Sequence, residues 1–210
     1  MSNTFKFGAV ALSVLALAAC HKTGSNANQD VTHPGDSAPV NTAQDVAAGP
    51  VGLASAATAT TAPDFVKAAA MGDMYEIDAG KIAVARAKRA DVKAFGQMMI
   101  DMHTKTSDDL KKVLKDNNIA ITPPADLDDR RKGMLQNLRA AGDSDFDGAY
   151  LHQQLAAHLE ALTLHSGYAD HGDNAALKAA AAKTKPIVQS HIDELKKIGG
   201  DALKDALPGK

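Results

Sequence analysis

Four titratable side chains occupy positions where the helical pattern of this 210-residue chain calls for apolar residues. In each of four long segments, one such residue lies within a stripe of apolar residues spaced three or four apart, the spacing of a buried helix face. The four are Glu76, His103, His158 and His191. Because a single buried polar group is costly, we expect each of them to be hydrogen-bonded to another polar group or bound to an ion.

The spacing of these residues along the chain indicates that they lie near one another. If the first two long helices form a hairpin, Glu76 and His103 each lie about 20 Å from its turn. In a second hairpin, His158 lies about 21 Å and His191 about 28 Å from the turn, an offset of roughly one helical turn. The depth of His191 is matched better by Gln154. We therefore expect a cluster near the middle of the bundle that is not a perfect layer.

Three interpretations of this cluster stay open. The groups could form a hydrogen-bond network that only fixes the register of the helices. They could bind a single transition-metal ion, since three imidazoles and a carboxylate suit iron, zinc or copper. They could also respond to pH, because imidazole titrates near neutrality. Under the metal interpretation, three nearby residues are candidates for holding the ligands in place: Tyr150, Gln154 and Glu194.

The pattern does not fit a standard di-iron centre. Such centres in helical bundles use a Glu on each of two helices and a Glu-x-x-His motif on each of the other two. Three residues before each of the three histidines, this chain has an apolar residue instead: Ile100, Leu155 and Val188. The near match at 191–194, His-Ile-Asp-Glu, has the reverse order. A single ion, or none, is therefore the expectation.

The segments that position these residues all have helical periodicity, and no strand pattern of period two is found. Five helices are expected, over about 64–88, 91–117, 127–141, from "DSDFDGAY" to 171, and 175–198. The prolines of "NNIAITPPAD" end the second helix. Four helices of about 25 residues with one short connector predict an all-α, four-helix bundle over residues 63–198, followed by a flexible tail at 199–210.

The first 62 residues differ in composition from this domain. Residues 1–19 have the plan of a secretory signal peptide, and "LAAC" resembles the lipobox of bacterial lipoproteins. By this resemblance Cys20, the only cysteine, would be the lipidated N-terminus of the mature protein; the alternative is an ordinary secreted protein. Residues 20–62 have almost no large apolar side chains, so we expect a disordered linker. The resemblance further implies a periplasm-facing anchor, favouring the outer membrane because Asp does not follow Cys20.

Four stretches carry a resemblance to a known family: "FVKAAAMGDMYEIDAGKIA", "VKAFGQMMIDMHTKTSDDL", "FDGAYLHQQLAAHLEAL" and "KPIVQSHIDEL". The chain resembles the bacterial exported proteins called domain of unknown function 4142, which adopt a ferritin-like bundle. The resemblance implies that fold, export and the Glu76, His103, His158 and His191 set, but no reaction. The second motif of such proteins usually reads Met-x-x-Asp-His, whereas this chain has Met102 before the histidine.

Two hypotheses for function remain. A net charge of −2 does not suggest a nucleic-acid partner, and no nucleotide-binding glycine loop, His-Glu-x-x-His or Gly-x-Ser-x-Gly motif supports a hydrolase. The first hypothesis is a non-catalytic binding or envelope-stress module, with the membrane as partner through its lipid anchor. The alternative is a transition-metal-binding or oxidative-defence protein that uses the glutamate and histidine cluster. A protein partner and the oligomeric state are not indicated by the sequence.

Overall fold

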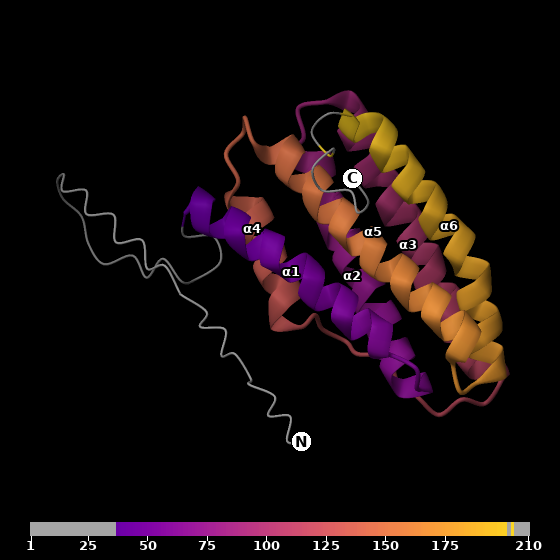
Figure 1. Ribbon diagram of the computed structural model, residues 1–210. Helices are drawn as coiled ribbons and strands as arrows, with labels where there is room; N and C mark the ends of the chain where they lie inside the picture. Colours follow the sequence, from indigo (N-terminus) through magenta and orange to yellow (C-terminus); the bar gives the residue numbers. More distant parts are fainter. Residues whose placement is uncertain (1–36, 201–202, 204–210) are drawn as a thin grey trace, which may run out of the picture.

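The computed structural model describes residues 37–200 and Leu203. All regular secondary structure in this part of the chain is helix (Figure 1). The predicted signal peptide, Cys20 and the first part of the predicted linker lie outside the described residues. No helix in the described part is both long and apolar enough to cross a membrane. The helices are α1 (Ala38–Thr58), α2 (Ala62–Arg86), α3 (Ala90–Asp116), α4 (Asp129–Ala140), α5 (Phe146–His171) and α6 (Ala175–Gly199).

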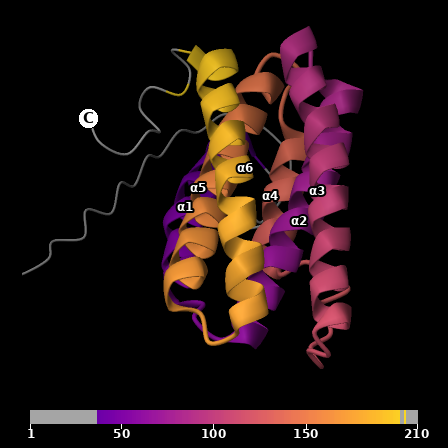
Figure 2. The same ribbon diagram turned by 90° about the vertical axis from the view of Figure 1, so that its right-hand side faces the viewer.

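The long helices α2, α3, α5 and α6 form the predicted bundle, and α4 is the predicted short extra helix (Figures 1 and 2). α2 and α3 pack together as one hairpin, and α5 and α6 as the other. Asp147, at the start of α5, accepts hydrogen bonds from the backbone N–H groups of Lys88 (3.0 Å) and Arg89 (2.9 Å), just before α3. α3 and α5 therefore start at the same end, and the connection through α4 crosses the length of the bundle.

Side chains just outside the helices fix where several of them begin. The hydroxyl of Thr61 accepts a hydrogen bond from the backbone of Asp64 at the start of α2. The carboxylate of Asp128 does the same for α4, and the amide oxygen of Asn174 accepts two backbone N–H groups of α6. Each of these contacts satisfies an N–H group that has no partner within its own helix. The starts of the bundle helices are thus specified locally.

The prediction of a disordered linker up to residue 62 is wrong for residues 38–58, which form α1. This helix packs against α4 and α5, with four small or polar residues buried: Asn41, Ala48, Gly52 and Ala56. The prediction considered only the burial of large apolar side chains. α1 is held instead by close approach of its backbone, which small residues allow, and by polar contacts from Asp45 to Asn137 (2.9 Å) and Gln153 (2.6 Å).

The apolar core is divided along the length of the bundle. One cluster of buried side chains surrounds Phe95, Met99, Leu151 and neighbouring residues near the α2–α3 turn. The other lies toward the opposite end and includes Phe65. On α3 and α5 the predicted polar residues fall between the two clusters, in the middle of the molecule. Apolar packing above and below therefore excludes bulk water from the level at which the polar groups meet.

The prediction of a flexible tail at 199–210 is wrong at Gly199, which is the buried last residue of α6, and at Leu203. Leu203 has only 1% of its surface exposed and packs into the apolar core near the end of α6. It lies so close to Gly199 that a Cβ atom there would overlap the Leu203 side chain. The remaining residues of that tail, 201–202 and 204–210, lie outside the described part of the chain. The apolar side chain of Leu203 explains the correction, because it covers an otherwise open edge of the core.

Candidate metal centre

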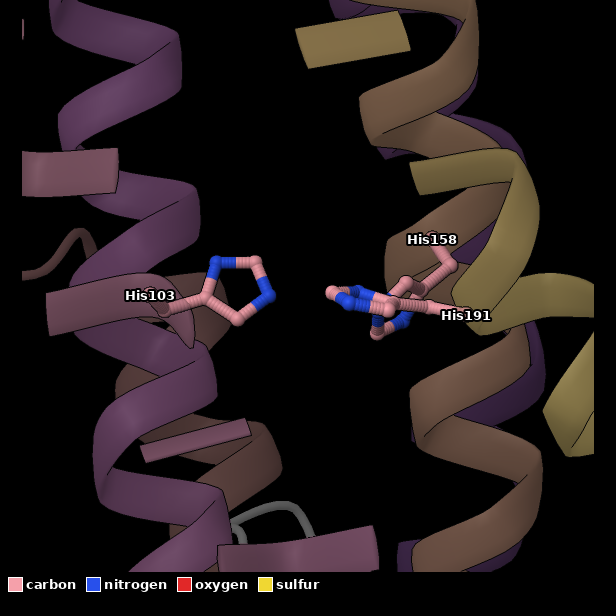
Figure 3. Close-up of side chains that lie close together, drawn as sticks. All are labelled: His103, His158 and His191. Atoms are coloured by element: carbon pink, nitrogen blue, oxygen red, sulfur yellow. The ribbon is translucent and has the colours of Figure 1, made fainter. Parts of the chain in front are cut away.

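Three histidines from three different helices converge in the middle of the bundle. Figure 3 shows His103 of α3 reaching across the interior toward His158 of α5 and His191 of α6. One ring nitrogen of each lies within 4.8 Å of those of the other two, and all three residues are buried. The ring centroids are 5.9 Å apart for His103 and His158, 5.7 Å for His103 and His191, and 5.3 Å for His158 and His191. The expected cluster is therefore formed.

Hydrogen bonds on the outer side of two rings decide which nitrogens face the centre. Nδ1 of His103 lies 2.8 Å from Oδ1 of Asp73, and Nδ1 of His158 lies 2.8 Å from the backbone oxygen of Gln154. Because carboxylate and carbonyl oxygens accept hydrogen bonds, each Nδ1 carries the proton and, in the neutral ring, each Nε2 keeps a lone pair. This is the orientation that outer hydrogen bonds impose on histidines that bind metals.

The inner nitrogens have few protein partners. Nε2 of His103 has none within the described residues, although it is buried. Nε2 of His158 lies 3.3 Å from Nδ1 of His191, and since the former holds a lone pair, the latter donates. An ion at the centre would replace this contact with two metal–nitrogen bonds. The histidine cluster is thus only partly satisfied by the protein itself.

Glu76 lies beside the three histidines, not among their converging nitrogens. Its Oε1 is 3.6 Å from Nδ1 of His158, on the outer side of that ring, and its Oε2 has no hydrogen-bond partner in the described structure. Burial raises the pKa of Glu76 to about 7, although the nearby His103 imidazole acts in the opposite direction. Close to neutral pH this carboxyl group, next to the histidine cluster, is therefore present in both its protonated and its ionised form.

The surroundings of the three histidines shift their pKa values in different directions. Burial lowers the pKa of His158 well below its ordinary value and that of His191 to about 4, so both rings are neutral at pH 7. Burial also acts to lower the pKa of His103, but the hydrogen bond that its ring donates to Asp73 and the charges of Asp73 and Glu76 raise it overall. Metal binding requires unprotonated imidazole, so the lowered pKa values of His158 and His191 favour it, whereas the raised pKa of His103 opposes it.

Asp73 is a functional candidate that the sequence analysis missed. Besides His103, its carboxylate accepts hydrogen bonds from the hydroxyls of Thr106 (2.8 Å) and Ser107 (3.1 Å). These contacts hold the carboxylate, and through it the His103 ring, in one orientation. A signal was present in the sequence, because Asp73 precedes Glu76 by three residues and so lies on the same face of its helix.

Two of the three residues predicted to hold the ligands lie next to the cluster. Gln154 is fully buried, and its backbone oxygen orients His158. Tyr150 is also fully buried, with its ring 6.4 Å from that of Phe95, and its hydroxyl finds no partner among the residues described. Both therefore bring unpaired polar atoms to the same region of the core.

The prediction for Glu194 is wrong. Its carboxylate lies 2.9 Å from Nζ of Lys197 on the outer face of α6, with 42% of the side chain exposed. Three residues after His191, the side chain is rotated by about 60° around the helix from that of the histidine. That rotation is enough to turn Glu194 from the bundle interior to the solvent.

The residues present fit one ion and not two. A cavity of about 40 Å³ at the cluster, lined by Glu76, the three histidines and Asp73 among others, has room for an ion or a few waters. The ring nitrogens are spread over up to 4.8 Å, whereas in a tetrahedral site with bonds of about 2.0–2.1 Å they would be about 3.3 Å apart. Binding thus requires a small inward movement of the rings. The carboxylates of a standard di-iron site are replaced by apolar residues, as the sequence indicates.

A second buried polar cluster lies between α1, α4 and α5, and the sequence analysis did not identify it. Glu160 accepts two hydrogen bonds from Arg130, both 2.9 Å, and one from Arg131 at 2.5 Å. Arg130 also donates to the backbone oxygen of Ala48 in α1. All of these charged groups are paired within the protein, so this cluster has the character of a structural network.

The comparisons with known proteins give a family but no function. No curated protein and no solved structure shows a significant match to the chain. A family model described as Domain of unknown function (DUF4142) matches residues 48–198, which include the second half of α1, all of α2 to α5, and α6 except Gly199. Because the match covers more than half of the sequence, including Glu76 and the three converging histidines, the chain belongs to this family.

Proposed function

We propose that this protein binds one transition-metal ion in the middle of its helical bundle, through His103, His158 and His191. The observation that carries the proposal is the convergence of three buried ring nitrogens within 4.8 Å, while outer hydrogen bonds orient two of the rings toward the centre. A network that only fixed helix register would be expected to pair its inner nitrogens. Nε2 of His103 is unpaired within the described residues, which favours a missing ligand.

The donor set indicates what such a site would do. Three neutral imidazoles suit zinc, iron or copper and leave at least one coordination position open. Glu76 lines the same cavity and has its pKa raised to about 7, so it is a candidate to exchange a proton with a molecule that enters the cavity. This supports the metal-binding or oxidative-defence alternative over a module without metal. The function that we propose is therefore metal binding with an open coordination position.

The direct test is a titration of the metal-free protein with Zn²⁺ and Co²⁺. We expect one equivalent to bind, with the intense visible absorption of tetrahedral Co²⁺ and the loss of that signal in His158→Ala. His152→Ala is the matched control, because His152 lies on the same helix but is exposed. Absence of stoichiometric binding in the wild type, or equal loss in both variants, would contradict the proposal.

A second test addresses the orientation of His103 by Asp73. Replacing Asp73 with Asn keeps the size of the side chain but weakens the hydrogen bond to the ring. We expect the affinity for metal to fall by about 10- to 100-fold, the usual effect of removing such a partner. Asp78→Asn on the same helix, whose carboxylate pairs with Lys81 at the surface, should bind metal like the wild type.

We propose separately that the protein is anchored in the cell envelope by lipid on Cys20 and faces the periplasm, in the outer membrane. The supporting features are the signal-peptide plan of residues 1–19 and the "LAAC" sequence. The helical domain then acts as a metal-binding module close to the membrane. Fractionation of cells that produce Cys20→Ser tests this proposal: the variant should leave the membrane fraction, and retention there would overturn the anchor but not the metal site.

A further inference from the structure

A second, larger cavity adjoins the histidine cluster and opens to solvent. It has a volume of about 260 Å³, and its lining residues come mostly from α3 and α6, two helices from different hairpins. Its outer rim includes the exposed residues Asp109, Lys112 and Lys183. We call it the α3–α6 groove. Because it reaches from these surface residues into the bundle, it forms a passage from solvent toward the interior.

The groove and the central cavity share part of their walls. The apolar side chains of Ala69 and Ile187 line both of them, as do four polar residues, Asp73, Thr106, His165 and Thr184, so the two spaces meet here. All four carry polar atoms that can contact a cation or its water shell. The polar junction is therefore the natural path by which a hydrated ion could approach the histidines.

His165 is the residue at this junction without an assigned role. Its Nδ1 is buried and has no hydrogen-bond partner in the described structure, and the ring packs edge-on against Phe65 with centroids 5.5 Å apart. Burial lowers its pKa to about 4, so the ring is neutral and its lone pair is free at pH 7. An apolar residue would fill the same space against Phe65 without burying an unpaired nitrogen. The imidazole thus has the properties of a ligand.

We propose that the α3–α6 groove is the route by which a divalent transition-metal ion reaches the central histidines, and that His165 binds the ion transiently on the way. This inference rests on the proposed metal site. The threonine hydroxyls and the imidazole would replace water molecules of the ion one at a time. Stepwise replacement avoids the large cost of stripping a cation of its hydration shell in a single step.

The test is the rate of Co²⁺ loading into the metal-free, full-length protein, followed by the visible absorption of the central site in a stopped-flow instrument. His165→Ala should load about tenfold more slowly while keeping the same final stoichiometry and affinity, since a route changes rates and not equilibria. His165→Phe, which keeps a ring but lacks the nitrogen, should be slow as well. His152→Ala, an exposed change on the same helix, should load at the wild-type rate.

A bulky residue in the groove tests the route independently of His165. Ala180 lines the groove on α6, so Ala180→Trp should slow both loading and chelator-driven release by a similar factor. Ala179→Trp is the matched control, because Ala179 is the preceding residue of α6, is exposed and does not line the groove. If Ala180→Trp fails to fold, the His165 variants still decide the question.

The outcomes separate this inference from the proposed function. If the wild type binds no metal, the central site itself is refuted and the route with it. If the wild type binds one equivalent but the His165 variants and Ala180→Trp load as fast as their controls, only the route is overturned. If His165→Ala loads faster while His165→Phe loads slowly, the ring is an obstacle and not a ligand, which overturns the role of His165.

Discussion

Two neighbouring glutamines of α5, both buried, have opposite surroundings. The amide of Gln153 donates to Asp45 (2.6 Å) and to the backbone oxygen of Met134 (3.0 Å), and accepts from the hydroxyl of Tyr75 (2.8 Å). Neither amide atom of Gln154 has a partner at hydrogen-bonding geometry within the described residues, although the amide lies close enough to Glu76 to act toward lowering the pKa of that carboxyl group. The two residues are consecutive, which turns their side chains about 100° apart around the helix. Gln153 faces α1 and α4, whereas Gln154 faces the centre of the bundle.

The difference extends to the two regions that these residues face. Under α1, Glu160 is paired with two arginines and the Gln153 amide is satisfied on both sides. In the centre, polar atoms of Glu76, His103 and Gln154 are unpaired in the described part of the molecule. Unpaired buried groups lower stability, so a protein keeps them where they serve another purpose. We interpret the first region as structural and the second as functional, and four predictions test this comparison.

The largest effect is expected for Glu160→Gln in the structural region. The change leaves the buried Arg131 and the half-buried Arg130 without the Glu160 carboxylate, which costs about 3–5 kcal/mol of unfolding free energy. Urea unfolding of the metal-free protein measures it. Glu194→Gln removes the exposed ion pair with Lys197 and should change stability by no more than about 0.5 kcal/mol. Equal stability of the two variants would show that the paired region is not structural.

A fall in pH should destabilise the protein through protonation of His165, which lines the central cavity. The pKa of His165 falls from 6.5 to about 4 on folding, so protonation favours the unfolded chain. Its contribution to stability is present above pH 6.5 and is lost as the pH falls toward 4, by at most about 3 kcal/mol.

The measurement is the difference in unfolding free energy between metal-free wild type and His165→Gln across this pH range. The wild type should lose stability relative to the variant as the pH falls. His152→Gln controls for the loss of an imidazole from α5. A difference between wild type and His165→Gln that stays constant with pH would contradict the prediction.

Substitution of the two neighbouring glutamines compares the stability of the two regions most directly. Gln153→Met breaks three hydrogen bonds and leaves the Tyr75 hydroxyl without its acceptor, so we expect a loss of about 2 kcal/mol. Gln154→Met removes unpaired atoms at nearly constant volume and should stabilise the metal-free protein by about 1 kcal/mol. Chemical denaturation compares them directly. Destabilisation of both to the same extent would remove the basis for treating the regions differently.

The smallest effect concerns the docking of α1. A Cβ at Gly52 would lie 2.0 Å from Oε2 of Glu160, so Gly52→Ala must displace this carboxylate. The cost is partly offset by the higher helix propensity of alanine, leaving a net loss of about 1 kcal/mol. Gly167→Ala, where a Cβ meets nothing within 4 Å, should stabilise by about 0.5–1 kcal/mol. A gain at Gly52 would indicate that α1 does not pack closely on Glu160.

The bundle helices were predictable because their signals are local. Apolar periodicity and the residues at helix starts, such as Thr61 and Asn174, act within a few residues of the chain. α1 was not predictable in this way. Its buried face consists of small residues whose contribution depends on how closely another helix approaches, and that approach is absent from the sequence pattern.

The candidate site likewise has residues that the sequence predicts and residues that it does not. A polar residue in an apolar stripe is visible in the sequence, so Glu76 and the three histidines were found together with their shared depth. Asp73 was missed because its role depends on a helix on the other side of a turn, where His103 and Thr106 meet its carboxylate. Glu194 was wrongly included because helical rotation directs it to Lys197 at the surface.

By itself, the sequence determined an all-helical bundle and the four ionisable residues turned toward its interior, because both follow from periodicity along one chain. Only the tertiary structure decided that three ring nitrogens converge while Glu76 lies beside them, that Asp73 orients His103, and that a groove reaches His165. The physical reason is that these features depend on distances of a few ångströms between different helices. Side-chain packing across the whole bundle sets those distances, and no local pattern encodes them.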